Sequence, residues 1–239
     1  MCGRFTSLLT PELLKVIYEI SVPVACAPHY NIAPTQQVLV VRDDFSGNRQ
    51  ATAMRWGLIP SWAKDSSSSA RMINARSETV HEKPAFRHAI RSRRCIIPAH
   101  GYFEWSKTGS TKIPHYISLK NGSPLSFAGI WEAWNSPVGE TVESFSILTT
   151  QANSLIEQIH DRMPVILHQA EHQLWLDRTV NDPLDLQRLY QPYPSELLQE
   201  WAVTNLVNSP HNDGPELIQP QDDVDNLLIW AKHIAVAPA

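Results

Sequence analysis

The chain has 239 residues, 43% of them hydrophobic, and a formal net charge of −4, so it can bury one substantial core and fits a single large domain. Its three cysteines, at positions 2, 26 and 95, are an odd number at wide spacing, which argues against a disulfide framework and favours a reducing compartment. The first residues lack a signal-peptide pattern, and no apolar run approaches membrane-spanning length. We therefore expect a cytoplasmic protein, nucleoid-associated if bacterial.

The predicted elements are short and mixed. In chain order we expect a helix at 11–20, strands at 36–41 and 51–60, a helix at 85–93, strands at 95–105, 115–120, 125–131 and 145–150, a helix at 152–159, a strand at 164–168, a helix at 170–177 and an amphipathic helical segment at 195–201. The Asn121-Gly122 pair predicts a hairpin. Because strands and helices do not alternate regularly, the pattern indicates an α+β single domain with a mainly antiparallel sheet, curled like a barrel and flanked by helices.

Charge is divided unevenly along the chain. The last 63 residues carry a net charge of −7, which leaves +3 for residues 1–176. Within the cationic part, KPAFRHAIRSRR (83–94) has five Lys or Arg and no acidic residue, a composition that suits a phosphate backbone. A solvated helix face explains the same pattern, and we favour that interpretation for this stretch taken alone.

A cysteine follows Met1 directly. Cysteine is small enough for methionine aminopeptidase to remove the residue before it, which would leave a thiol and an α-amine on one residue. With ordinary pKa values of about 8 for the amine and about 8.5 for the thiol, both groups are nucleophiles at neutral pH. An aldehyde suits the pair, because the amine forms a Schiff base and the thiol then closes a five-membered thiazolidine ring. The alternative is that Cys2 is an ordinary buried small residue.

Five further segments resemble, in order, the motif series of the SRAP family, the SOS-response-associated peptidases or abasic-site processing proteins. They are YNIAPTQ (30–36), RWGLIPSW (55–62), INARSET (73–79), GYFEW (101–105) and IHDRMPVIL (159–167). An ordered series is far more specific than one motif. The resemblance covers about nine-tenths of the chain and leaves out the acidic tail, so we divide the chain into an SRAP-like domain at 2–219 and an acidic C-terminal extension at 220–239.

The resemblance implies a substrate and four catalytic residues. The substrate is the ring-opened aldehyde of an abasic deoxyribose in single-stranded DNA, captured by Cys2. Glu104 would shuttle protons during imine formation, a task that needs a carboxyl pKa raised by an enclosed site. Asn74 would orient the aldehyde oxygen or the amine through its amide. His160 would exchange a proton with the sugar oxygen and assist both imine formation and reversal of the crosslink.

The resemblance also implies a set of DNA-binding residues. Forked guanidinium groups would pair with phosphates, indole rings would stack on the bases beside the lesion, and a proline would act as a wedge against a neighbouring base. These residues are Arg4, Arg76, Arg162, Trp62, Trp105 and Pro34. Each also has an ordinary structural explanation in a salt bridge, a core or a turn. Another tryptophan, Trp56, is expected in the core.

Other functions remain open at this point. MCG also begins class II glutamine amidotransferases, whose N-terminal cysteine attacks a side-chain amide, although their other motifs are not found. A metal-dependent hydrolase is suggested by His168 and His172 at i, i+4 spacing, without a third ligand. A non-catalytic single-stranded DNA-binding module would keep the arginines and tryptophans but have no use for Cys2. Peptidase activity, implied by the family's older name, is expected as self-cleavage ahead of Cys2.

The remaining expectations concern partners. We expect single-stranded DNA with abasic sites as the partner, no cofactor, no metal and no membrane. The chain is expected to be a monomer, and its acidic tail is a candidate contact for proteins of the replication fork.

Overall fold

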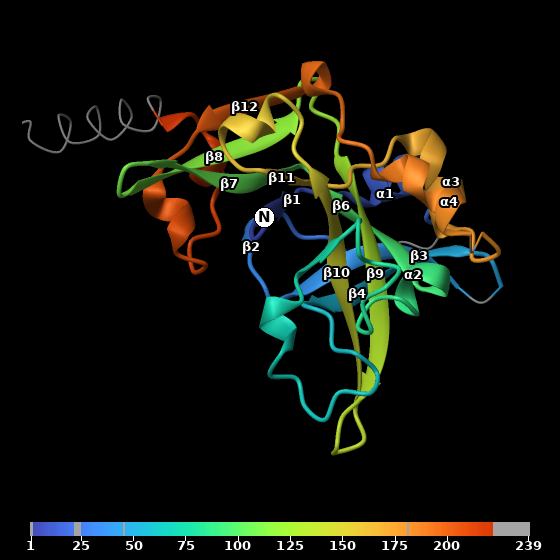
Figure 1. Ribbon diagram of the computed structural model, residues 1–239. Helices are drawn as coiled ribbons and strands as arrows, with labels where there is room; N and C mark the ends of the chain where they lie inside the picture. Colours follow the sequence, from blue (N-terminus) through green and yellow to red (C-terminus); the bar gives the residue numbers. More distant parts are fainter. Residues whose placement is uncertain (1, 22–24, 45, 181, 222–239) are drawn as a thin grey trace, which may run out of the picture.

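The computed structural model describes residues 2–21, 25–44, 46–180 and 182–221. Two β-sheets form its body (Figure 1). The first sheet has five strands in the order β12-β8-β7-β1-β2, and all neighbours are antiparallel. Its strands are β1 (Phe5–Ser7), β2 (His29–Ile32), β7 (Gly101–Thr108), β8 (Thr111–Leu119) and β12 (Leu198–Ala202).

The second sheet closes on itself. Its strands run in the order β10-β4-β3-β6-β9, and β9 pairs again with β10, which makes a five-stranded barrel. These strands are β3 (Gln37–Asp43), β4 (Arg49–Trp56), β6 (Arg94–Ala99), β9 (Leu125–Asn135) and β10 (Thr141–Gln151). Only β4 and β10 are parallel within the ring. The expected barrel-like, mainly antiparallel α+β fold is therefore confirmed.

Two short strands extend the end of β10. They are β5 (Asn74–Arg76), which runs parallel to β10, and β11 (Arg162–Pro164), which runs antiparallel to it. Both segments carry residues of the motifs, so INARSET and IHDRMPVIL lie on either side of the end of β10. This arrangement positions the candidate site.

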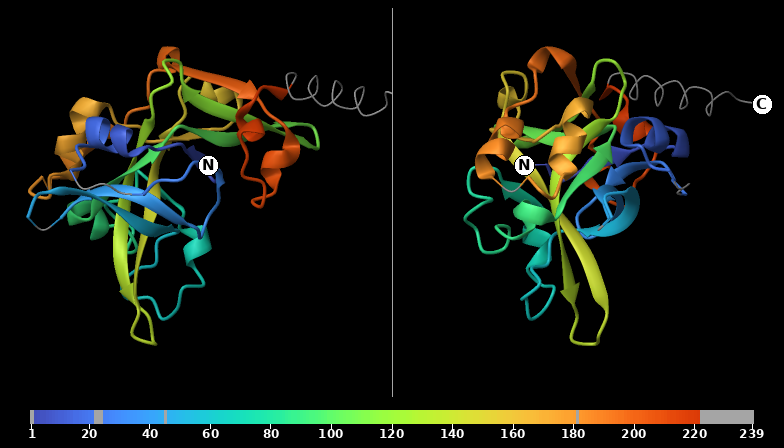
Figure 2. Two further views of the ribbon diagram at one scale, coloured as in Figure 1. Left: turned by 180° about the vertical axis from the view of Figure 1, so that it is seen from behind. Right: turned by 90° about the vertical axis from the view of Figure 1, so that its right-hand side faces the viewer.

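Helices are few and short. They are α1 (Pro11–Tyr18), α2 (Ala89–Ser92), α3 (His172–Leu176) and α4 (Pro183–Gln187), with 3₁₀ turns η1 (Ser69–Arg71), η2 (Ile156–Gln158), η3 (Gln169–Glu171), η4 (Arg188–Tyr190), η5 (Ser195–Leu197), η6 (Asn205–Asn208) and η7 (Pro215–Ile218). Helices α1, α3 and α4 gather at one end of the barrel (Figure 2). Thr10 caps α1 by accepting a hydrogen bond from the Leu13 amide, and Glu19 ends it in the left-handed conformation, slightly before the predicted end at 20.

The main core lies between the two sheets. Phe5 of the first sheet packs edge-on against Trp56 and Phe127 of the barrel. Trp56 is fully buried and donates from its indole nitrogen to the Ile73 carbonyl oxygen at 3.0 Å, which confirms its predicted place in the core. A second apolar cluster lies between the barrel and its helices, and a third covers the opposite face of the first sheet beneath η6 and η7.

Three sequence-based predictions differ from the structure. Asn121 and Gly122 do form a tight turn, but it joins β8 of the first sheet to β9 of the barrel, so the two strands are not a hairpin. The segment predicted as a strand at 95–105 is divided at His100, where the chain passes from the barrel into the first sheet. The amphipathic segment at 195–201 is η5 followed by β12, because pairing with β8 supplies its backbone hydrogen bonds.

The predicted helices are shortened to different degrees. Only 89–92 of the segment predicted at 85–93 is α-helical, and the segment at 152–159 contains only the 3₁₀ turn η2. In the basic stretch 83–94, Arg94 is buried and donates to backbone carbonyl oxygens of Ile90 and Trp175. Arg93 pairs with Glu132 at 2.7 Å. This stretch is therefore partly structural rather than one solvated face.

Two further predictions concern membrane spans and the C-terminal tail. No helix of the described ranges is long and apolar enough to cross a membrane. Most of the proposed C-terminal extension, residues 222–239, lies outside the described residues. The expected contact between this tail and replication proteins therefore stays a prediction.

Candidate active site

Cys2 lies where the chain enters the first sheet. The next residues form β1, which pairs with the start of β7, and the Phe103 amide donates to the Arg4 carbonyl oxygen at 2.9 Å. The Cys2 side chain is fully buried. Burial, and then the negative charge of Glu104, raise the pKa of its thiol well above the usual range. The thiol is thus held in its neutral form close to a carboxyl group.

Glu104 projects from β7 and is only 3% exposed. Burial raises the pKa of this carboxyl above its ordinary value, and nearby positive charge, including that of His160, partly opposes the shift. A carboxyl group in such a position can hold or release a proton closer to neutral pH than an exposed glutamate can. The sequence-based prediction of an enclosed Glu104 agrees with this environment.

Asn74 is the first residue of β5. Its backbone is fixed by parallel pairing with Ile147 of β10. Its amide nitrogen Nδ2 donates to the Cys2 carbonyl oxygen at 2.8 Å. The amide oxygen Oδ1 is buried and has no hydrogen-bond partner among the described residues, so it is available as an acceptor. Asn74 therefore both holds the segment that carries Cys2 and offers a polar atom beside it.

His160 lies between η2 and β11 and is partly exposed. Its ring nitrogen Nδ1 lies 3.0 Å from the backbone nitrogen of Arg162 and 2.8 Å from Oδ1 of Asp161. These contacts are alternatives, because a neutral Nδ1 accepts from the amide whereas a protonated Nδ1 donates to the carboxylate. The ring is therefore held by contacts within its own segment.

Tyr102 is a neighbour that the sequence analysis missed. It lies two residues before Glu104 on β7, so both side chains point to the same face of the sheet. Its ring is fully buried against Phe127, and its hydroxyl oxygen has no hydrogen-bond partner within the described ranges. The period-two alternation around Glu104 is the sequence signal from which this residue could have been found.

The three predicted phosphate-binding arginines have different surroundings. Arg76 of β5 is exposed. Arg4 is partly buried, and its Nη1 donates to Oδ1 of Asn31 at 2.7 Å and to the Val207 carbonyl oxygen at 2.8 Å. Arg162 is buried and binds Glu78 with two hydrogen bonds, of 2.5 and 2.9 Å, and the Thr149 carbonyl oxygen at 2.6 Å. Only Arg76 thus presents an open guanidinium group.

A sequence pattern for SOS response associated peptidase (SRAP) matches residues 1–210. The chain is 45% identical over 225 residues to the abasic site processing protein YoqW of Bacillus subtilis, with 92% of this chain and 99% of YoqW covered. The chain belongs to the SRAP family. It is also 42% identical to the abasic site processing protein YoaM of the same organism, over 93% of this chain and 99% of YoaM. The fold is similar to the X-ray structure of a Bacteroides thetaiotaomicron protein, with a TM-score of 0.80 and 30% sequence identity. The match covers 92% of this chain and 99% of the Bacteroides protein.

In this SRAP chain, the two tryptophans predicted to stack on bases and the predicted wedge Pro34 also differ in their exposure and contacts. Trp62 is 65% exposed. Gly57, at φ +115°, begins the loop that leads to it, and a Cβ there would lie 2.6 Å from the Ser69 carbonyl oxygen, so only glycine fits. Trp105 is half-buried in the cluster on the opposite face of β7 from Glu104, and it donates to Oδ1 of Asn208 at 2.8 Å. Pro34 is partly exposed and precedes Thr35, whose φ is +75°.

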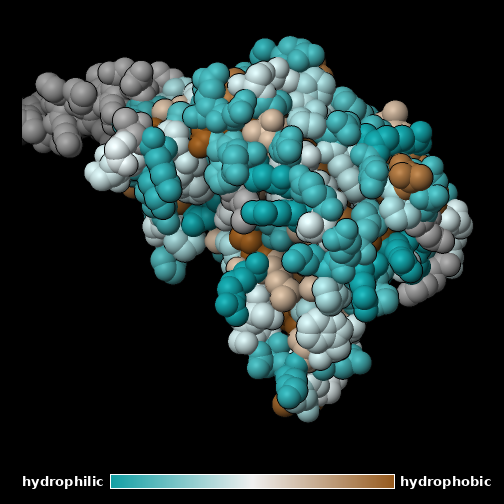
Figure 3. Space-filling view, in the orientation of Figure 1, coloured by the Kyte–Doolittle hydropathy of each residue, from teal (hydrophilic) through white to brown (hydrophobic). Residues whose placement is uncertain are grey.

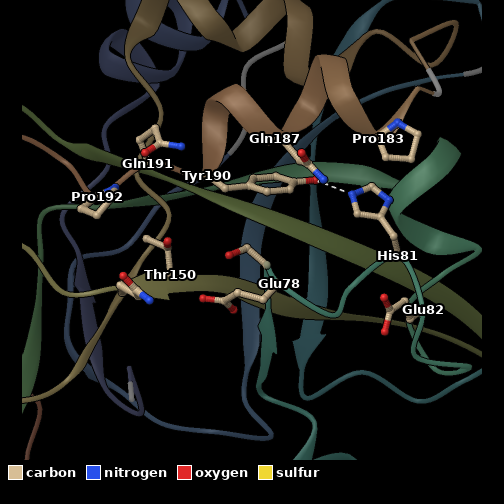
Figure 4. Close-up of a pocket in the computed structure, with 11 residues that line it drawn as sticks. Glu78, His81, Glu82, Thr150, Pro183, Gln187, Tyr190, Gln191 and Pro192 are labelled. Carbon is tan, nitrogen blue, oxygen red and sulfur yellow. Dashed lines mark hydrogen bonds between the residues drawn. The ribbon is translucent and has the colours of Figure 1, made fainter.

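Two neighbouring cavities open beside β5, β10 and β11 of the SRAP fold. One, of about 350 Å³, is lined by Arg76, Gln151, Glu157, Asp161 and Arg162 among others. The other, of about 400 Å³, shares Gln151 and holds a hydrogen bond of 3.1 Å between His81 and Tyr190 (Figure 4). Figure 3 shows that the surface is also hollowed between the first sheet with its C-terminal turns and the lower part of the barrel. Arg76 and Arg162 therefore border open space.

His168 and His172, the pair that suggested a metal hydrolase, are separated by their partners. His168 stacks on Tyr193 with ring centroids 4.7 Å apart, and His172 stacks on Tyr18 at 5.4 Å. Within the described ranges, no group of three or more His, Cys, Asp or Glu residues is arranged to hold a metal ion.

Proposed function

We propose that this SRAP protein captures abasic sites in single-stranded DNA by covalent attachment through Cys2. The observation that carries the proposal is the enclosed contact set of Cys2: its buried thiol lies in the field of the Glu104 carboxyl, and its carbonyl oxygen accepts a hydrogen bond from Asn74. The similarity to abasic site processing proteins over nearly the whole chain supports the same substrate.

The chemistry uses two groups of one residue. After removal of Met1, the α-amine of Cys2 attacks the aldehyde carbon of the ring-opened deoxyribose, and loss of one water gives an imine. The thiol then adds to the same carbon, its proton passes to the imine nitrogen, and a thiazolidine closes. Because the enclosed thiol is neutral, it needs a nearby base to lose its proton at that step.

Glu104 is the group that moves these protons. Its raised pKa suits a carboxyl that donates a proton to the departing hydroxyl group and accepts one from the thiol. His160 is proposed to exchange a proton with the sugar oxygen, since its ring is partly exposed and close to Glu104. Asn74 is proposed to accept a hydrogen bond through Oδ1 from the amine or from the sugar hydroxyl.

The DNA strand is proposed to lie across the open side of this centre. Arg76 pairs directly with a phosphate, whereas Arg4 and Arg162 add positive charge while held by their protein partners. Trp62 offers an open ring for stacking on a base. Pro34 and the exposed part of Trp105 contact the bases on either side of the lesion. A local cationic surface of this kind binds a phosphate backbone despite a net charge of −4.

Intact mass spectrometry tests the proposal. The protein is incubated with an oligonucleotide that carries one abasic site, and the same oligonucleotide without the lesion is the control. We expect a protein that begins at Cys2 and a heat-stable adduct whose mass is that of protein plus oligonucleotide minus one water. Retention of Met1 in a fully reactive preparation, or attachment at another residue, would overturn the mechanism.

A further inference from the structure

Three side chains beyond the candidate site form a hydrogen-bonded relay across the first sheet. The hydroxyl oxygen of Ser106 lies 3.0 Å from Nε2 of His115, and Nδ1 of His115 lies 2.8 Å from a carboxylate oxygen of Glu200. The residues come from β7, β8 and β12, which are consecutive neighbours in the sheet. A serine, a histidine and a carboxylate in this order are the parts of a nucleophile, its base and the group that orients the base.

The strand register places all three on one face. His115 is paired with Glu104, and Ser106 follows Glu104 by two residues, so Ser106 and His115 are diagonal neighbours. Glu200 is paired with Ile117, two residues beyond His115, and is the next diagonal neighbour. The relay is therefore held by three paired strands rather than by loops, and it lies on the same face of the sheet as Glu104.

The hydrogen bonds are consistent with one protonation pattern. An ionised Glu200 can only accept, so Nδ1 of His115 donates to it. In the neutral ring Nε2 is then the unprotonated nitrogen, and it accepts a hydrogen bond from the hydroxyl group of Ser106. This is the tautomer that a general base requires in order to take a proton from serine.

The relay is reachable from solvent, unlike Cys2. Ser106 is partly exposed, and the side chains of His115 and Glu200 are 17% and 28% exposed. Two hydroxyl pairs elsewhere in the described residues lack this arrangement. Thr6 and Tyr116 share a buried hydrogen bond, and Ser154 and Ser195 form an exposed pair at 3.3 Å with no histidine in the hydrogen bond. Ser195 is partly exposed, as Ser106 is, but has no histidine partner in its hydrogen bond, so it provides an internal control.

We propose that Ser106 is a nucleophile for acyl transfer, with His115 as its base, and that it hydrolyses small activated esters. The Oγ–carbon bond forms at the carbonyl carbon while the ester carbon–oxygen bond breaks; the Ser106 proton passes to Nε2 and then to the departing alkoxide. Water repeats the sequence on the acyl-serine and releases the acid. The major cavities of the described residues are lined by other side chains, so the open face takes small acyl donors with good leaving groups rather than peptide segments.

A fluorophosphonate probe tests the proposal in the whole protein. After brief labelling, peptide mass spectrometry locates the adducts. We expect Ser106 to be labelled at least tenfold faster than Ser195, and labelling to fall at least tenfold in His115→Gln and by a smaller factor in Glu200→Gln. Turnover of 4-nitrophenyl acetate is measured in Cys2→Ser, so that acylation of the thiol does not contribute, and it should be lost when Ser106→Ala is added.

Melting curves of each variant show whether loss of labelling reflects unfolding. If His115→Gln unfolds, labelling of Ser106 in the folded wild-type protein relative to Ser195 still decides the proposal. Labelling of Ser106 no faster than that of Ser195, or an unchanged rate in a folded His115→Gln protein, would overturn it.

Discussion

The candidate site combines two regions with opposite surroundings. The enclosed region contains Cys2 and Glu104, which are almost inaccessible to solvent, with Asn74 hydrogen-bonded to the Cys2 carbonyl. The open region contains Trp62 and Arg76, which are both exposed, and Arg76 also lines a cavity. Burial shifts the proton affinities of the reacting groups and fixes their positions, whereas exposure leaves charged side chains and aromatic rings available to a DNA strand. The two regions should therefore respond to mutation through different quantities: reaction rate in the first, DNA affinity in the second.

The largest effect is expected for Cys2→Ala. Without a thiol, an imine can still form and be trapped by borohydride, but no thiazolidine can close. The heat-stable adduct should disappear, while affinity for undamaged single strands should change by less than about twofold, because Cys2 is buried and makes no open surface. Denaturing gels with and without borohydride measure the adduct. An equally heat-stable adduct in Cys2→Ala would show that another residue makes the bond.

The next largest effect is expected for Glu104→Gln. Loss of a proton-transferring carboxyl should slow crosslinking by about 10²–10⁴-fold, with DNA affinity nearly unchanged. Single-turnover crosslinking at saturating protein isolates the rate. A rate within a few-fold of wild type would remove Glu104 from the mechanism.

The same variant also tests the enclosed environment through stability. Burial raises the pKa of Glu104 in the folded protein above the ordinary 4.5, so the folded chain holds this proton more tightly than the unfolded chain. The stability from this group is thus present below pH 4.5 and is lost as the pH rises through the raised pKa. Glutamine stays neutral, so Glu104→Gln should melt higher than wild type at pH 7, and the difference should shrink toward pH 4. A gap that is independent of pH would contradict this environment.

Arg162→Ala and Arg76→Ala distinguish an arginine that is held by protein contacts from one that is exposed to solvent. Arg162→Ala removes four hydrogen bonds to Glu78 and Thr149 and should destabilise the fold by about 1–3 kcal/mol. Arg76→Ala should leave the unfolding free energy within about 0.5 kcal/mol and lower the slope of log affinity against log salt by about 0.7. Denaturant titrations and salt-dependent binding measure the two. Equal stability of both variants would mean that the Arg162 contacts contribute little.

Trp62→Ala should weaken single-strand binding by about 1–3 kcal/mol without a change in the salt slope, because stacking involves no released counterions. The matched control is Trp62→Phe, which keeps an exposed ring at the same position and should retain most of the affinity. Fluorescence anisotropy at several salt concentrations measures both. If Trp62→Ala binds duplex and single strands with wild-type affinity, the ring is not a stacking surface.

The smallest effect is expected for Thr35→Gly beside Pro34. Thr35 has a φ of +75°, a left-handed conformation that costs a β-branched residue about 1–3 kcal/mol. Glycine removes this cost but adds freedom to the unfolded chain, so we expect a net stabilisation of about 1 kcal/mol. Denaturant titration measures it, and a destabilised variant would show that Thr35 makes compensating contacts.

Local signals predicted much of this structure. β-Branched and aromatic runs identified most strand positions, and the order of motifs gave Cys2, Asn74, Glu104 and His160 as candidate site residues. The partners of those strands were not predictable, since pairing joins segments far apart in the chain. The Asn121 turn illustrates this: its residues fix a local bend, but only the closure of the barrel decides that the next strand joins the other sheet.

The partners of individual side chains were equally unpredictable from the sequence. Arg162 and Glu78 are 84 positions apart, and His115 and Glu200 are 85 apart. No periodicity in a single sequence reports such pairs, because they depend on the register of three or more strands. A motif therefore indicated which residues gather at the site, but it did not indicate which arginine is available to DNA and which is held by a carboxylate.

The hydrogen bond from Arg4 to the Val207 carbonyl oxygen joins residues 203 positions apart, and this has a consequence for the timing of biosynthesis. The segment that carries Cys2 is synthesised first, whereas β7 and the turn that holds Arg4 follow much later. At about 5–20 residues per second, the beginning of the chain stays uncovered for on the order of 10–40 s. Removal of Met1, which the proposed reaction requires, can take place in that interval. The hydrogen bond that holds Arg4 forms only after Val207 has been synthesised, long after Cys2.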